Sequence, residues 1–321
     1  PDSGVLIDMR SAFSIELTDL ALIGSMQAFR EVSHLGILKR NLLSDIDTFD
    51  RAAVCLRINT AGRGGAAAEL TLRRIYVSDA DTGIEIGGLG RNVCGSDMLI
   101  EDLGMSHCQT GFRTMKHQNV NFVFIRPQAG NCGTGLHFVE GGSVSAILYS
   151  GKKVDRFVKI DHGGINAGNF AFHIMKPEFH PGPLTGRRGA VVEAKGEVNV
   201  TFTGLCTGVI GLFGEKGDRE SPLFIVGPSA QVQVEGSMIS GHIAHVEGAP
   251  EIGPAFIRFD SCRFRCAAHP HRDITANEEG GYSFVDCIYS EDRFDAQGQY
   301  KQVQPTKFLD RLTKKPAMPA E

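Results

Sequence analysis

Four titratable side chains fill the same position of a short recurring phrase, and their types could carry out acid–base chemistry. The phrase has an apolar–x–apolar pattern, usually led by glycine, as in Gly83–Ile86. Apolar neighbours on both sides would point the central side chain of a strand away from the core. Successive phrases, stacked as neighbouring strands, would therefore align these side chains in one outward strip. In chain order they are Glu85, Arg113, His137 and Lys159.

Such a strip suits proton removal beside the carboxylate of a uronic acid. Elimination from a uronate needs a cation to neutralise the carboxylate, a base to take the adjacent proton and an acid to protonate the departing oxygen. The strip and the segments just after its strands supply all three types. The candidate cations are Arg113, Lys116 and Lys159, the candidate bases are Lys159, His137 and His162, and the candidate acids are His117 and His162.

Polar residues around the strip are candidate substrate-binding groups. Glu85 opens the strip, and Arg156 lies in the charged segment just before Lys159. His180 lies in a proline-stiffened loop at 176–183 that could wall a groove beside Lys159. Outward strand positions of a solenoid are polar by default, so an ordinary solvated face is the competing interpretation. The substrate-binding candidates are Lys116, His117, Arg156, Glu85 and His180.

A pair of carboxylates offers a rival chemistry. Glycoside hydrolases place an acid and a base or nucleophile about 5 to 9.5 Å apart. Glu140 and Asp161 occupy nearby positions in successive phrases, so they are candidates for such a pair. Carboxylates are also ligands for calcium, although no Asp-x-Asp motif adjoins this pair to support a calcium site. The sequence therefore assigns no metal ion and requires no cofactor, with Ca²⁺ as the open alternative.

The same phrases indicate the elements that must position these residues. They return at irregular spacing of about 22 to 32 residues, each followed by a turn and a second strand with alternating apolar residues. Repeats of this length are typical of stacked architectures. Because the repeat contains strands and no helix, we predict an all-β fold, a right-handed parallel β-helix of about nine to ten rungs. The inward sets include Phe122 and Phe124, Phe170 and Phe172, and Val200 and Phe202.

The rhythm of the phrases divides the chain into two parts. Residues 1–290 are predicted to form the β-helix domain, with 25–51 as a loop excursion, and 291–321 a polar C-terminal cap or tail. Within that tail the pattern at 307–312 predicts a short amphipathic helix over the final rung. A strand solenoid needs a cap over its first rung, and little sequence precedes Val5. We therefore expect an upstream segment of the same gene product.

The Gly–apolar–x–apolar phrases between Val5 and Tyr289 resemble those of the pectin-lyase-like superfamily of right-handed parallel β-helices. The resemblance is architectural and selects no single family. It implies activity on polysaccharides, because members include lyases, hydrolases, epimerases, a fructotransferase and phage tailspikes. A lyase acting on an acidic glycan is the first expectation, and a hydrolase or transferase is the second. The third is a non-catalytic tailspike, adhesin or structural β-helix that binds glycan or assembles as a homotrimer.

Composition excludes some classes of partner. The net charge of −4 and the sequence pI of about 6.3 give no basic footprint for nucleic acid. No apolar run approaches the length of about 18 residues that a membrane span needs. The eight cysteines include no Cys-x-x-Cys pair of the kind that often holds zinc, so we expect mostly buried thiols, with one or two disulfides as the alternative. The expected location is secreted or periplasmic, and the expected partner is a polysaccharide substrate.

Overall fold

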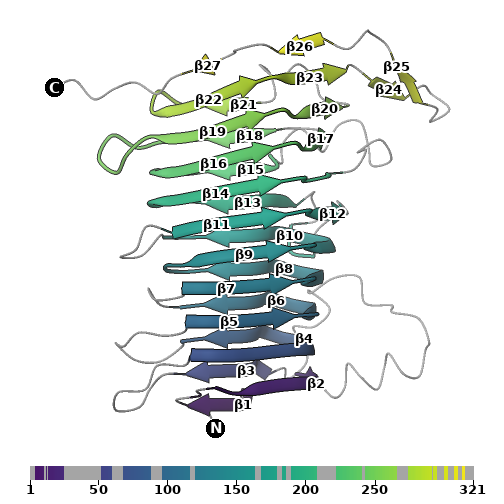
Figure 1. Ribbon diagram of the computed structural model, residues 1–321, viewed down its shortest axis with the longest axis vertical. Helices are drawn as coiled ribbons and strands as arrows, with labels where there is room; N and C mark the ends of the chain where they lie inside the picture. The colour runs from purple at the N-terminus through teal and green to yellow at the C-terminus, as the bar shows by residue number, and fades with distance from the viewer. Residues whose placement is uncertain are drawn as a thin grey trace.

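The computed structural model describes residues 4–10, 12, 14–24, 52–59, 68–87, 96–115, 120–162, 168–178, 183–185, 189–207, 222–240, 243–265, 274–290, 292–294, 300–302, 307–309 and 313–314. The predicted excursion at 25–51 lies outside these residues. The described chain winds around a central axis and rises from β1 at one end to the C-terminal strands at the other (Figure 1). The expectation of an all-β parallel β-helix is confirmed, because the strands stacked along its two long faces pair in parallel.

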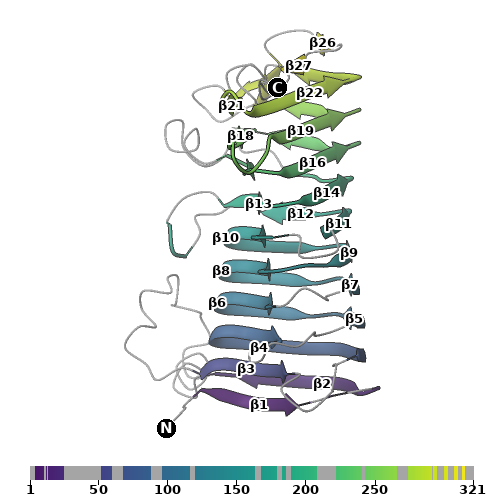
Figure 2. The same cartoon turned by 90° about the vertical axis from the view of Figure 1, so that its left-hand side faces the viewer.

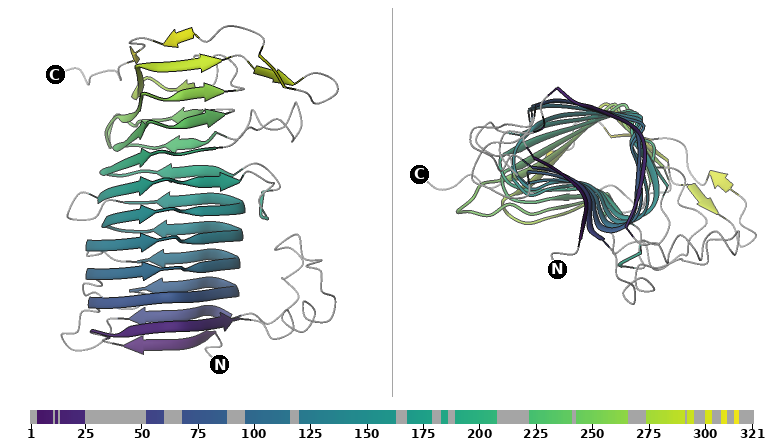
Figure 3. Two further views of the ribbon diagram at one scale, coloured as in Figure 1. Left: turned by 45° about the vertical axis from the view of Figure 1, so that its right-hand side comes forward. Right: turned by 90° about the horizontal axis from the view of Figure 1, so that it is seen from below.

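Two faces carry most of the strands. Face A is a stack of short strands that begins at the start of β4 (Ala68–Ile86) and continues with β5 (Ser96–Glu101), β7 (Val120–Ile125), β9 (Ser143–Ile147), β11 (Gly168–His173), β14 (Val198–Thr203), β16 (Ala230–Glu235), β19 (Ala255–Asp260) and β22 (Gly280–Val285). The strand β2 (Glu16–Ile23) pairs with β4 below this stack. Viewed from below, the faces enclose a common interior (Figure 3).

Face B holds the predicted phrases, at the end of longer strands in the first rungs. It consists of β1 (Val5–Arg10), β3 (Ala52–Asn59), β4, β6 (Gly104–Thr114), β8 (Gln128–Phe138), β10 (Ser150–Ile160), β13 (Ala190–Ala194), β15 (Phe224–Val226), β18 (Ala244–Val246) and β21 (Ile274–Ala276). The short β12 (Lys176–Glu178) pairs with the start of β10. The side view shows these strands stacked rung on rung (Figure 2).

The described rungs leave face A through the same left-handed corner. The corner residue has a φ between 50° and 70°, and its neighbours pair in register from rung to rung. Its amide donates to a carbonyl of the next rung, for example Asp102 to Ile125 at 2.9 Å. Such φ values favour glycine, yet most members of the column are other residues. The column is Asp19, Arg74, Asp102, Arg126, Leu148, Ile174, Gly204, Gly236, Ser261 and Asp286.

Glycine leads the face B phrases because the chain approaches itself closely there. A Cβ atom on Gly135 would lie 1.9 Å from the Tyr149 hydroxyl and 2.8 Å from the Phe157 carbonyl oxygen. The Tyr149 side chain is fully buried and donates its hydroxyl to that same carbonyl at 2.9 Å. Glycine is therefore required at position 135 because the neighbouring rung leaves no space for a Cβ atom.

The interior is a continuous stack of aromatic and aliphatic side chains. The predicted inward residues are buried, and their rings contact across rungs, as for Phe172 and Phe202 with centroids 5.1 Å apart. All six described cysteines are free thiols, and five of them are buried. Burial raises the pKa of the Cys55 thiol to about 11, so it stays protonated at neutral pH. The predicted role of these cysteines as small core residues is confirmed for this part of the chain.

The C-terminal segment forms strands where the sequence predicted a helix. A small sheet contains β17 (Met238–Ser240), β20 (Arg263–Arg265), β23 (Cys287–Ser290) and β26 (Lys307–Leu309), and β27 (Thr313–Lys314) pairs with β22. Both β26 and β27 run antiparallel to the last rung, whose open edge offers unpaired backbone groups. Backbone pairing with that edge stabilises a strand at 307–309 more than the weak helical pattern of the sequence favours a helix there. A separate hairpin joins β24 (Asp292–Phe294) and β25 (Tyr300–Gln302).

In the part of the chain that the structure describes, no helix has the length and apolarity needed to cross a membrane.

Candidate active site

The predicted strip exists, and its members are in register. Glu85 pairs with Arg113, Arg113 with His137, and His137 with Lys159 along β4, β6, β8 and β10. These central side chains lie between buried neighbours, as the alternation predicted. The column also extends beyond the predicted residues at both ends, to Arg57 on β3 and Glu193 on β13. We call the set Arg57, Glu85, Arg113, His137, Lys159 and Glu193 the face B strip.

Asp161 connects three side chains at the middle of this strip. It follows the last residue of β10, and its amide donates to the Phe138 carbonyl at 2.9 Å. Its Oδ2 atom lies 2.7 Å from His137 Nε2. Its Oδ1 atom lies 3.4 Å from Lys159 Nζ and 3.5 Å from Lys195 Nζ. We call these four residues the Asp161 centre.

Charge at the Asp161 centre favours an ionised carboxylate. Burial by itself would raise the pKa of Asp161, but the hydrogen bond from His137 and the neighbouring positive charges outweigh it and lower the pKa to about 2. The carboxylate is then a pure acceptor at neutral pH. Two ammonium groups share this one carboxylate, so the centre keeps an excess of positive charge for an anionic ligand.

The ionised carboxylate also fixes the tautomer of His137. Because Asp161 can only accept, His137 Nε2 must carry the hydrogen of their 2.7 Å contact. In the neutral imidazole the lone pair then lies on Nδ1. The His137 side chain is 14% exposed, and that of Lys159 is 26% exposed. The centre therefore presents an oriented imidazole and two lysines at a partly open surface.

The side chains in the lower part of the strip, Arg57, Glu85 and Arg113, form ion pairs with one another. Glu85 is 3% exposed and lies between two arginines. Arg57 Nε donates to its Oε1 atom at 2.8 Å, and Arg113 Nη2 donates to its Oε2 atom. A buried carboxylate with both oxygens engaged is ill placed to bind substrate directly. Glu85 therefore holds the two guanidinium groups in position, and Arg113 is the register partner of His137 on the strand below.

Arg156 and Asp155 support the other side of the centre. Arg156 Nε donates to Glu193 on the next rung. Asp155 is buried, and its carboxylate accepts from the amides of Leu184 and Thr185, both at 3.0 Å. These bonds fasten residues 183–185 to β10. This anchor lies between β12 and β13, just after the loop at 176–183 that is predicted to wall a groove.

The remaining predicted residues are less informative. Glu140 is half-buried two residues beyond the end of β8, and exposed His162 directly follows Asp161. The amide of Gly141 donates to the His162 carbonyl at 3.0 Å, which ties these two turns together. Lys116, His117 and His180 lie outside the described residues.

Two cationic contributors escaped the sequence-based candidate set. Arg57 sits in an apolar–x–apolar phrase without a leading glycine, so the pattern at Leu56–Ile58 could have identified it. Lys195 contacts Asp161 from just beyond the end of β13, one rung further along the solenoid. No pattern in the sequence around Lys195 predicts that its side chain contacts a residue of the preceding rung.

Within the described residues, no group of three or more His, Cys, Asp or Glu side chains could hold a metal ion.

The fold and the site define a parallel β-helix with a cationic, histidine-containing strip on one face. No family model, curated protein or solved structure matches the chain. The functional argument therefore rests on the geometry of the strip.

Proposed function

We propose that the protein is a polysaccharide lyase that cleaves an acidic glycan by β-elimination at the Asp161 centre. The observation that carries the proposal is the contact set of one carboxylate, Asp161, with His137 at 2.7 Å and with two lysines at 3.4 and 3.5 Å. A secreted or periplasmic location and kinship with the pectin-lyase-like superfamily accord with such an activity, and both belong to the proposal.

The side chains divide the reaction among them. Lys159 and Lys195 neutralise the uronate carboxylate, which makes the adjacent carbon more acidic. His137 Nδ1 then takes the proton from that carbon while Nε2 remains bonded to Asp161. The electron pair of the broken C–H bond forms a double bond as the glycosidic oxygen leaves. That oxygen takes a proton from water or from His162, so atoms and charge balance without a cofactor.

The two-carboxylate hydrolase is the weaker alternative. A general acid must hold a proton at the working pH. The pKa of Asp161 is about 2, so this carboxyl is deprotonated throughout the neutral range. Its oxygens are also engaged by His137 and by two lysines. Asp161 is better suited to orient a base than to donate a proton.

An absorbance screen tests the proposal. Purified protein is incubated with a panel of acidic polysaccharides, and the ultraviolet band of unsaturated uronates is followed. We expect the signal to grow with wild type and to fall by about 10² to 10⁴-fold in His137→Ala, the usual contribution of a general base. Lys159→Ala should also lose most of the rate.

Lys152→Ala is the matched control for Lys159→Ala. Lys152 is an exposed lysine at the start of β10, before the strand reaches the strip. The rate of this variant should equal that of wild type. Equal losses in both lysine variants, or a signal that survives His137→Ala unchanged, would contradict the assignment of the site.

A further inference from the structure

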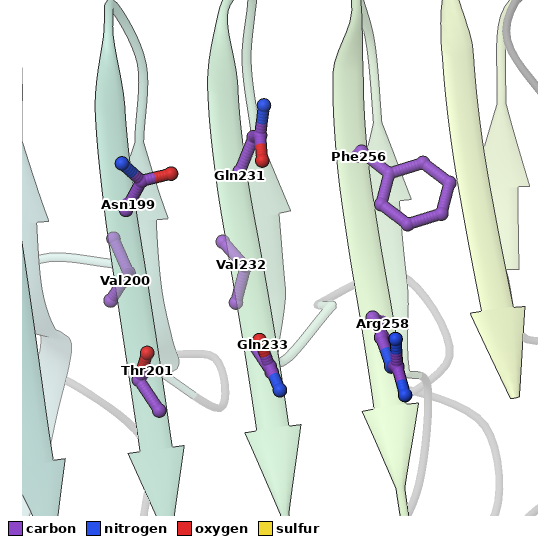
Figure 4. A pocket seen from close by; sticks show the side chains of 8 residues that line it. All are labelled: Asn199, Val200, Thr201, Gln231, Val232, Gln233, Phe256 and Arg258. Atoms are coloured by element: carbon purple, nitrogen blue, oxygen red, sulfur yellow. The ribbon is translucent and has the colours of Figure 1, made fainter. Parts of the chain in front are cut away.

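A second hollow lies on face A, away from the face B strip. Three neighbouring strands, β14, β16 and β19, form a pocket of about 280 Å³. Figure 4 shows two rows of outward side chains crossing these strands, with Val200 and Val232 between them. The first row is Asn199, Gln231 and Phe256, and the second is Thr201, Gln233 and Arg258.

The lining combines neutral polar groups with one aromatic ring. Amides and hydroxyls both donate and accept hydrogen bonds. The side chains of Gln231 and Thr201 make no hydrogen bond to any other described residue, and that of Asn199 reaches only Asn169, at a long 3.4 Å. The pocket therefore offers unused donors and acceptors in rows repeated about every 4.8 Å along the solenoid axis.

Two carboxylates adjoin the pocket, because Glu235 accepts a hydrogen bond from the lining residue Gln233 and Asp260 pairs with Arg258. Arg258 is the one charged residue in the described lining, and its Nη2 lies 2.8 Å from Asp260 Oδ2. The half-buried Phe256 closes one row with a flat apolar face. Such rings pack against apolar C–H surfaces while neighbouring polar groups fix the orientation of the ligand. The face also lies across strand centres, where no free backbone edge could pair with a peptide.

We propose that this face A pocket binds an uncharged carbohydrate chain, independently of the face B strip. Sugar hydroxyls donate and accept like the amides that line the pocket, and a pyranose unit spans a length comparable with one rung. The C–H face of a sugar would stack on Phe256, while Gln231 and Thr201 bond to its hydroxyls. An anionic chain is disfavoured there because the carboxylate of Asp260 already satisfies Arg258.

Affinity electrophoresis with neutral glycans tests the proposal on the full chain. The gels contain amylose, dextran, galactomannan or hydroxyethyl cellulose, and retardation is converted to a dissociation constant. We expect retardation by at least one of them and a rise in that constant of about three- to tenfold in Gln231→Ala and in Phe256→Ala. Gln231 is exposed, so its replacement leaves the fold intact even if Phe256→Ala does not.

Gln128→Ala supplies the matched control, since Gln128 is an exposed glutamine on β8. This variant should bind as wild type does. Absence of retardation by every neutral glycan, or equal weakening in Gln231→Ala and Gln128→Ala, would overturn the proposal. Self-association that depends on Gln231, without glycan binding, would also overturn it and assign the pocket to contact with a second copy. None of these readings depends on catalysis, so they stand apart from the lyase test.

Discussion

Replacing Asp161 by asparagine should destabilise the protein at neutral pH and have little effect in acid. The carboxyl has an ordinary pKa of 3.8 and a folded-state pKa of about 2. Its side chain is 22% exposed, so solvent screens it only partly. The gap between the two pKa values corresponds to a stabilisation of roughly 2 kcal/mol while the group is ionised in both states. Asparagine keeps the shape of the side chain and lacks the charge.

The sign of the pH dependence follows from the lowered pKa. Above about pH 5 the wild type has the full stabilisation, because the carboxyl is then ionised in the unfolded chain as well as in the folded one. As the pH falls, the unfolded carboxyl is protonated first, and the stabilisation is lost progressively down to about pH 2. The asparagine side chain that replaces it has no proton equilibrium in this range. The difference between wild type and Asp161→Asn should therefore shrink from roughly 2 kcal/mol towards zero across this window.

Urea unfolding followed by circular dichroism, repeated over a pH series, measures this difference. Asp260→Asn is the control, since Asp260 pairs at 2.8 Å with a single arginine, Arg258, whose side chain is 44% exposed. That variant should lose less than about 1 kcal/mol. A loss in Asp161→Asn that stays constant from neutral pH to the acid limit would refute the electrostatic reasoning, and so would no loss at neutral pH.

Two further predictions concern the scaffold. Gly135→Ala should destabilise by several kcal/mol, because its Cβ would meet the Tyr149 hydroxyl at 1.9 Å, whereas Gly130→Ala, with no atom within 4 Å, should be neutral in urea unfolding. Comparable midpoints for the two variants would contradict the close approach. Asp155→Ala should release residues 183–185, with a loss of about 1 to 3 kcal/mol and faster limited proteolysis there. Unchanged cleavage would show that the anchor is unimportant.

The strip could be predicted because the orientation of each of its side chains depends on residues next to it in the sequence. Apolar neighbours on both sides of Glu85, Arg113, His137 and Lys159 specify which way each points, and a shared phrase specifies that they align. Burial of inward rings such as Phe122 follows from the same alternation. These features need only a period of two residues and a repeated unit, both visible in the chain.

Other features depend on contacts between rungs and were not predictable. Asp161 meets His137 from 24 residues away, and nothing in either phrase specifies that meeting. The left-handed corner escaped detection because residues such as Arg126 and Ile174 occupy it, where glycine is the usual signal. Residues 307–309 form a strand and not the predicted helix because they pair with the open edge of the last rung. In each case the observed conformation depends on contacts with a neighbouring rung.

The central claim is that the Asp161 centre removes a proton from a uronate. The most direct measurement counts both kinds of new chain end in the same digest of an acidic polysaccharide. Elimination yields one unsaturated end for each new reducing end, so the two counts should rise together with wild type and vanish together in His137→Ala. New reducing ends without unsaturated ends would show hydrolysis and contradict the account.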